Sequence, residues 1–116
     1  MGGSEPKLYL NRGNDKFLDI TESSGLVLHG NNFVATWGDY DNAKDLDLVI
    51  THWSSFSQDH YAYFWRNNGD STFTDVSAEV GMKGVMLQFG SRDKSFTPTF
   101  ADIDSDGWQD LLLVSD

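Results

Sequence analysis

The sequence contains no cysteine, which excludes disulfides, thiolate metal sites and thiol catalysis. It has two prolines and no apolar run long enough to cross a membrane. Residues 1–6 lack an apolar stretch, so we expect a flexible segment or a cloning remnant there instead of a signal peptide. Any export signal is therefore expected to lie outside this sequence.

Basic residues are also scarce, with eight Lys and Arg against eighteen Asp and Glu, for a net charge of −10. Nucleic acids and anionic membrane surfaces require basic partners, so we expect binding to neither. No membrane insertion is expected either, because no apolar run is long enough. In contrast, aromatic residues make up 14% of the 116 residues, and there are 11 glycines. This composition favours one modest domain of short strands separated by turns.

The chain repeats itself in two places. Asn11–Thr21 reads like Asn67–Ser77, and Thr36–Asp41 reads like Thr99–Asp104. The distance along the sequence between Thr36–Asp41 and its match is longer than that between Asn11–Thr21 and its match. The later unit therefore has a longer connection before its acidic stretch. Two matched segments in the same order indicate repeated structural units.

Each unit reads as short strands split by turns, and the sequence predicts strands throughout. The expected strands are Leu8–Asn11, Phe17–Thr21, Phe33–Trp37, Asp47–Thr51, Tyr61–Arg66, Phe73–Ser77, Phe96–Ala101 and Asp110–Val114. Residues 111–114 are apolar at every position, which is typical of a strand covered on both faces. The strand aromatics Trp37, Tyr40, Tyr61, Tyr63 and Trp65 are expected in the core.

The acidic stretch 102–110 has the spacing of a calcium loop. Carboxylates occupy positions 1, 3, 5 and 9, which are Asp102, Asp104, Asp106 and Asp110. Gly107 at position 6 suits a sharp turn, and the backbone carbonyl of Trp108 at position 7 is an expected ligand. Oxygen ligands in this number favour Ca²⁺ over Mg²⁺. The alternative is an Asp-rich surface turn capped by its own side chains.

The equivalent stretch 39–47 is a degraded copy of this loop. Its acidic residues are Asp39, Asp41, Asp45 and Asp47. Ala43 stands at position 5, where it cannot ligate, and Lys44 stands at position 6. Two hypotheses remain open: the site is empty, with the Lys44 ammonium in the place of the cation, or it binds calcium weakly.

These motifs resemble the FG-GAP/VCBS repeat family over nearly all of residues 7–116, most closely its bacterial and cartilage-acidic-protein types. The matching stretches are Gly38-Asp39-Tyr40-Asp41-Asn42, Asp45-Leu46-Asp47-Leu48, Arg66-Asn67-Asn68-Gly69-Asp70 and Phe73-Thr74-Asp75-Val76. The resemblance implies an all-β fold of four-stranded antiparallel propeller blades like those of integrin α heads. It also implies calcium in the turn between the first two strands of a blade, and a secreted or cell-surface protein.

Counted against such blades, the chain is arranged as half, whole, half. Residues 7–21 give half a blade, residues 33–77 a full blade and residues 96–116 another half. A propeller needs about four to eight blades to close, and terminal half-blades leave open sheet edges. Either the chain is an excerpt of a longer propeller, or copies complete one another head to tail as a ring or filament.

We therefore expect an extracellular calcium-binding structural or adhesive module that forms a homo-oligomer or polymer. The alternative is a piece of a larger secreted propeller that binds a protein or glycan through its loops. Trp53 and Trp108 are candidate contacts for such a ligand, as is the long loop Ala78–Lys94. No enzymatic activity is expected, because the loop between His52 and His60 shows no recognised catalytic spacing.

Overall fold

The computed structural model describes residues 5–28, 32–52, 62–82 and 95–115. Its elements are the strands β1 (Tyr9–Asn11), β2 (Phe17–Asp19), β3 (Asn32–Gly38), β4 (Asp47–His52), β5 (Tyr63–Asn67), β6 (Phe73–Asp75), β7 (Ser95–Ala101) and β8 (Asp110–Ser115). Every strand expected from the sequence is present, and the predicted all-β class is confirmed.

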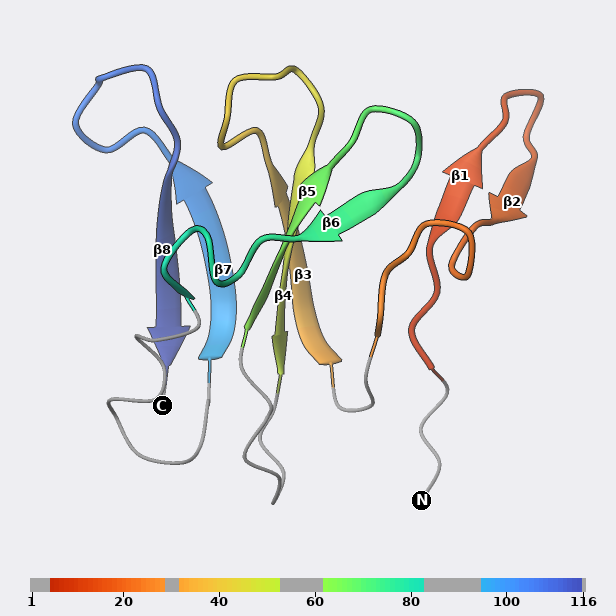
Figure 1. The fold of residues 1–116 in the computed structure, drawn as a ribbon, viewed down its shortest axis with the longest axis horizontal. Helices are drawn as coiled ribbons and strands as arrows, with labels where there is room; N and C mark the ends of the chain where they lie inside the picture. Colours follow the sequence, from red (N-terminus) through yellow and green to blue (C-terminus); the bar gives the residue numbers. More distant parts are fainter. Residues whose placement is uncertain (1–4, 29–31, 53–61, 83–94, 116) are drawn as a thin grey trace.

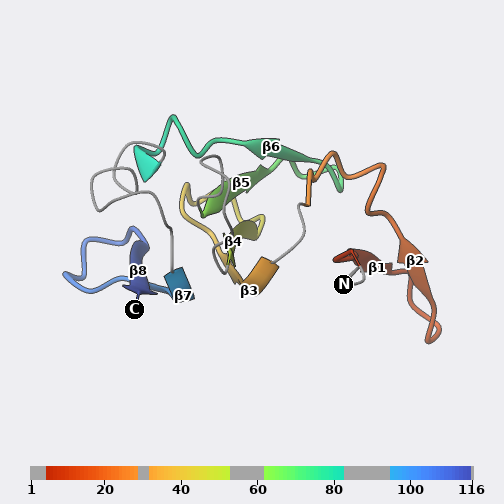
Figure 2. The ribbon, with the colours of Figure 1, turned by 90° about the horizontal axis from the view of Figure 1, so that it is seen from below.

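The strands form three antiparallel sheets in the order β1–β2, β3–β4–β5–β6 and β7–β8. Figure 1 shows the four-stranded sheet in the middle, with the two hairpins on either side. Seen from below, β3 and β7 lie on the same side of the molecule and β6 lies on the opposite side (Figure 2). The predicted half–whole–half arrangement of propeller-type blades is therefore confirmed.

The sequence repeats are also repeats of strand register. Tyr9 faces Asp19 in the first hairpin, and Trp65 faces Asp75 in the central sheet, at the spacing of the first sequence repeat. Hydrogen bonds repeat at the same spacing. The Leu8 N–H donates to the Thr21 hydroxyl at 2.8 Å, as the equivalent Phe64 N–H donates to the Ser77 hydroxyl at 2.9 Å.

The second sequence repeat is likewise a repeat of strand register, in the pairs β3–β4 and β7–β8. Gly38 faces Asp47 between β3 and β4, and the equivalent Ala101 faces Asp110 between β7 and β8. The β7–β8 hairpin is thus the structural equivalent of β3–β4, and β1–β2 is the equivalent of β5–β6.

The strand β4 is buried on both faces, since every one of its residues is buried. Towards β7–β8, the core contains Val49, Phe64 and Val76, with Phe100, Leu111 and Leu113 packed against them. Towards β1–β2, it contains Leu26, Leu48, Ile50 and Trp65, with Leu8, Leu28, Tyr63 and Phe73 packed against them. The predicted core position of Trp65 is confirmed at 4% exposure.

Two expectations about buried apolar residues are wrong. Trp37 is 43% exposed, although a core position was predicted. In β8, Leu111 and Leu113 pack on the central sheet, but Leu112 is 63% and Val114 is 50% exposed. Alternate residues of a strand face opposite sides, and among the described residues no further sheet covers the outer side of β8.

The contact between the central sheet and β7 leaves no room for a side chain at Gly38. A Cβ built there would lie 2.4 Å from ring atoms of Phe100. We expect Gly38→Ala to lower the free energy of unfolding by about 1–3 kcal/mol, because overpacking displaces the ring. Urea denaturation measures this change.

Ala101→Ser is the matched control, because Ala101 is the exposed equivalent of Gly38 in the last sheet. It should change stability by less than about 0.5 kcal/mol. Equal stability of the Gly38→Ala and parent proteins would contradict the packing described here.

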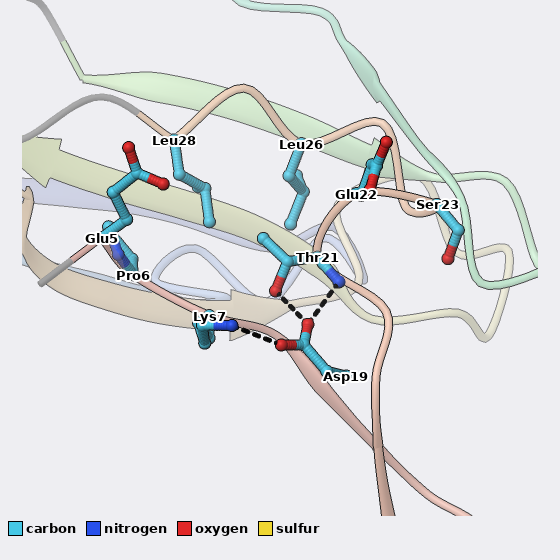
Figure 3. Close-up of a pocket in the computed structure, with 9 residues that line it drawn as sticks. All are labelled: Glu5, Pro6, Lys7, Asp19, Thr21, Glu22, Ser23, Leu26 and Leu28. Carbon is cyan, nitrogen blue, oxygen red and sulfur yellow. Dashed lines mark hydrogen bonds and ion pairs between the residues drawn. The ribbon is translucent and has the colours of Figure 1, made fainter.

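An ion pair joins the N-terminal segment to β2. The Lys7 ammonium lies 2.6 Å from the Asp19 carboxylate, which also accepts hydrogen bonds from the Thr21 N–H and hydroxyl (Figure 3). The hydrogen bonds from Lys7 and then Thr21 lower the pKa of Asp19 from 3.8 to about 2. The ionised carboxylate therefore stabilises the hairpin above pH 3.8.

This stabilisation should disappear as the pH falls from 3.8 to about 2, because Asp19 is protonated over that range. Asp19→Asn should lower the urea midpoint at neutral pH and converge with the parent near pH 2. Asp15→Asn, a substitution on the same hairpin, serves as the control. A parent–Asp19→Asn difference that is constant with pH would contradict the assignment.

Candidate metal centre

The two acidic turns connect equivalent strands and curl in the same way. In the first, between β3 and β4, the Ala43 N–H donates to Asp39 Oδ1 at 3.0 Å and Asp41 Oδ1 at 3.1 Å. The Lys44 N–H donates to Asp39 Oδ2 at 2.9 Å. The carboxylates at positions 1 and 3 thus hold the backbone of positions 5 and 6.

The second turn, between β7 and β8, repeats these bonds position by position. The Asp106 N–H donates to Asp102 Oδ1 at 3.1 Å and Asp104 Oδ1 at 3.2 Å. The Gly107 N–H donates to Asp102 Oδ2 at 2.9 Å. Because Asp106 carries a carboxylate where Ala43 has none, it also accepts the Trp108 N–H at 2.8 Å.

Each turn gathers three carboxylates, whose oxygens lie within 4.8 Å of one another. The groups are Asp102, Asp104 and Asp106 in the second turn, and Asp39, Asp41 and Asp47 in the first. All the grouped donors are oxygens, which suits a hard cation such as calcium. The second group is exposed, whereas the first includes the buried Asp47.

Two predicted carboxylate ligands, and the predicted carbonyl ligand of Trp108, lie outside these groups. One Asp110 oxygen accepts the Ile103 N–H at 2.9 Å, closing the second turn from position 9 to position 2. The Asp45 carboxylate lies against Gly69, 3.1 Å from where a Cβ on that glycine would be. The ligand roles of Asp110, Asp45 and the Trp108 carbonyl remain predictions.

Asp47 has a structural role that the sequence reading did not anticipate. Its side chain is buried and accepts the Tyr40 N–H at 3.1 Å and the Asn67 N–H at 2.9 Å. Burial raises the pKa of Asp47, the two hydrogen bonds oppose that shift, and the charges of Asp41 and Asp39 add to it. Asp47 therefore ties the first turn to β5.

Lys44 does not take the place of a cation in the first turn. Within the described part of the chain, the ion pairs join Lys7 to Asp19 and Arg66 to Glu79. Lys44 belongs to neither pair, so the hypothesis that its ammonium neutralises the carboxylates is wrong. Its backbone has a φ of 72°, close to the 90° of Gly107 at the same position.

Hydrogen bonds join the two turns to each other. The Asp39 N–H donates to the Gln109 side-chain oxygen at 2.9 Å, and the Asn42 amide donates to the Gly107 carbonyl at 3.2 Å. The sequence predicted no bridging role for Gln109 or Asn42. The available signal was that Gln109 stands where the first turn has Leu46.

Comparison with known protein families identifies the family to which these turns belong. A family model described as an FG-GAP-like repeat matches residues 39–113, which span both acidic turns. The chain belongs to the FG-GAP-like repeat family. No curated protein and no solved structure matches the chain.

In this FG-GAP-like chain, some predicted contact residues lie outside the described part of the structure. They are Trp53 and residues 83–94 of the loop Ala78–Lys94, and the predicted core residue Tyr61 and the histidine His60 also lie outside it. Trp108 is described and is 53% exposed on the second turn. A search of the described residues finds no helix with the length and hydropathy needed to span a bilayer.

The positive φ of Lys44 generates a prediction for the first turn. L-residues incur a steric penalty in this backbone region that glycine avoids, so Lys44→Gly should raise the free energy of unfolding by about 0.5–1 kcal/mol. Thermal unfolding in chelator measures the change without metal.

Lys44→Ala is the matched control, because it removes the same charge and keeps a Cβ at positive φ. It should leave stability close to that of the parent. An equal gain from both substitutions would show that charge, and not backbone strain, is relieved.

Proposed function

We propose that this chain is an extracellular structural module whose acidic turns are stiffened by calcium and whose blades are completed by copies of itself. The observation that carries the proposal is the shared frame of hydrogen bonds in the two turns, each of which gathers three carboxylates. Membership of the FG-GAP-like family supports it, because repeats of this type are typically extracellular.

The second turn is the stronger candidate for calcium. Asp102, Asp104 and Asp106 supply side-chain oxygens, and Asp110 and the Trp108 carbonyl are the further expected ligands. A bound ion would neutralise the mutual repulsion of these carboxylates and fix the turn. Gly107 supports the turn at a φ of 90° without strain.

The first turn offers a weaker site. Ala43 removes one carboxylate, and Asp47 already accepts two backbone N–H groups. Because Gln109 and Asn42 bridge the turns, an ion in the second turn would also stiffen the first. Calcium would thus hold the central sheet and β7–β8 in one orientation.

The same proposal assigns the chain an assembling role and no catalytic step. Its two outer hairpins are the equivalents of the two halves of a blade. Head-to-tail completion of these halves would produce a homo-oligomer or polymer. If copies do not associate, the alternative is a longer propeller that binds a protein or glycan.

Calcium titration by calorimetry tests the metal site with a matched pair of variants. Asp104→Asn and Asp41→Asn change the same position of the two turns. We expect Asp104→Asn to weaken the tighter calcium site at least about tenfold, because it removes the negative charge of one ligand. Asp41→Asn should leave that site nearly unchanged.

Two results would contradict the calcium proposal. One is the absence of calcium binding by the parent protein. The other is an equal loss of affinity in both variants, which would mean that the two turns do not differ as described.

A further inference from the structure

The two outer hairpins match the two sides of the strand pairing between β4 and β5. In the central sheet, Leu48 faces Trp65 and Val49 faces Phe64. Shifting β4 forward along the sequence by the spacing of the second repeat gives β8. Shifting β5 back by the spacing of the first repeat gives the segment that contains β1. The equivalent pairing would place Leu111 opposite Tyr9 and Leu112 opposite Leu8.

β1 has an open edge that suits this pairing. The Leu8 N–H donates to the Thr21 hydroxyl at 2.8 Å, and the Leu8 carbonyl accepts the Ile20 N–H at 2.9 Å. Both backbone groups of Leu8 are therefore directed towards β2. Alternation along the strand turns those of Tyr9 to the other edge, where β1 has no partner among the described residues.

The outer face of β8 is the uncovered equivalent of a buried face. Leu112 is 63% and Val114 is 50% exposed, whereas their equivalents Val49 and Thr51 are 0% exposed. Val49 is buried because Phe100, Leu111 and Leu113 pack in the same cluster. Burial of Leu112 needs the equivalent apolar surface from another sheet.

That apolar surface lines a groove of about 410 Å³ beside the N-terminal segment. Its apolar lining includes Leu8, Leu26, Leu28, Trp37, Leu48 and Ile50. Trp37, Leu48 and Ile50 are the equivalents of Phe100, Leu111 and Leu113, the residues that pack around Val49. The groove therefore carries the surface that Leu112 lacks.

The groove is continuous with a second hollow that shares part of its lining. Leu26 and Leu28 line both, and Figure 3 shows their side chains pointing towards Lys7 and Asp19 across that hollow. Leu28 is exposed only partly, so the leucines present an apolar wall on one side. A hairpin beside β1 would lie along this wall.

We propose that the β7–β8 hairpin of a second copy of this chain seats in this groove, pairing β8 with β1 and burying Leu112 and Val114. A second copy is the occupant because this chain carries a hairpin with the required register and an exposed apolar face. The inference rests on the proposed function and names its partner surface. The contact is head to tail, so it propagates into a ring or filament.

Cysteine cross-linking between copies tests the register. The parent has no cysteine, so Leu8→Cys and Leu112→Cys are placed on separate copies of different mass and mixed under mild oxidation. Leu8 and Leu112 would face each other as a non-hydrogen-bonded pair, whose short separation suits a disulfide. We expect a heterodimer band.

The control replaces Leu112→Cys with Ile103→Cys, on the turn of the same hairpin. Ile103 is 81% exposed, so random collisions would favour it. The Leu8–Leu112 mixture should give at least about tenfold more heterodimer, because the groove holds the two thiols together. Equal yields, or no heterodimer, would overturn the proposal.

Amide exchange provides a second test that uses no substitution in β1 or in the residues next to it. The Tyr9 N–H should be protected at high protein concentration and lose that protection in Leu112→Asp, which puts a charge on the buried face. Ile103→Asp should keep the protection. Rapid exchange of Tyr9 in the parent at all concentrations would refute the pairing.

These results are separable from those of the calcium experiment. Cross-linking and amide exchange report the strand pairing whether or not the turns bind metal. Calorimetry reports the metal site whether or not copies associate.

Discussion

The packing of β7 across β3 and β4 is the contact on which the rest of the structure depends. The Phe100 ring lies on Gly38 and meets Phe64 edge-on, with 5.9 Å between ring centroids. A short-stranded sheet that is apolar on both faces is stable only between neighbours, as in other repeat proteins. The complete burial of Val49 shows what such a neighbour supplies, whereas Leu112 is exposed because no described sheet packs on the next face.

The acidic turns lie where this packing brings equivalent strands together. Because the sheets are aligned, Gln109 and Asn42 can connect one turn to the other. Asp47 then connects the first turn to β5 through the Asn67 N–H. A cation in the second turn would thus hold whole sheets in a fixed relative orientation. The proposed completion of blades between copies depends on that orientation. Net charge of −10 opposes the association of copies, and cations reduce that repulsion.

Much of the fold could be predicted because the repeat spacings determine strand register as well as strand position. The spacing of Asp102, Asp104 and Asp106 likewise identified the grouped carboxylates before any geometry was known. The contacts of Gln109 and Asn42 could not be found this way, since they depend on how two sheets are oriented. Apolar patterning predicted cover for Trp37 and Leu112, and both are exposed, because the pattern identifies apolar positions and not the sheet that would pack on them.

Sedimentation velocity of the unmodified chain, first with calcium and then with chelator, most directly tests whether blades are completed between copies. Head-to-tail completion predicts particles larger than the monomer that grow with protein concentration in calcium and diminish in chelator. A well-folded monomer at every concentration in both conditions would contradict it.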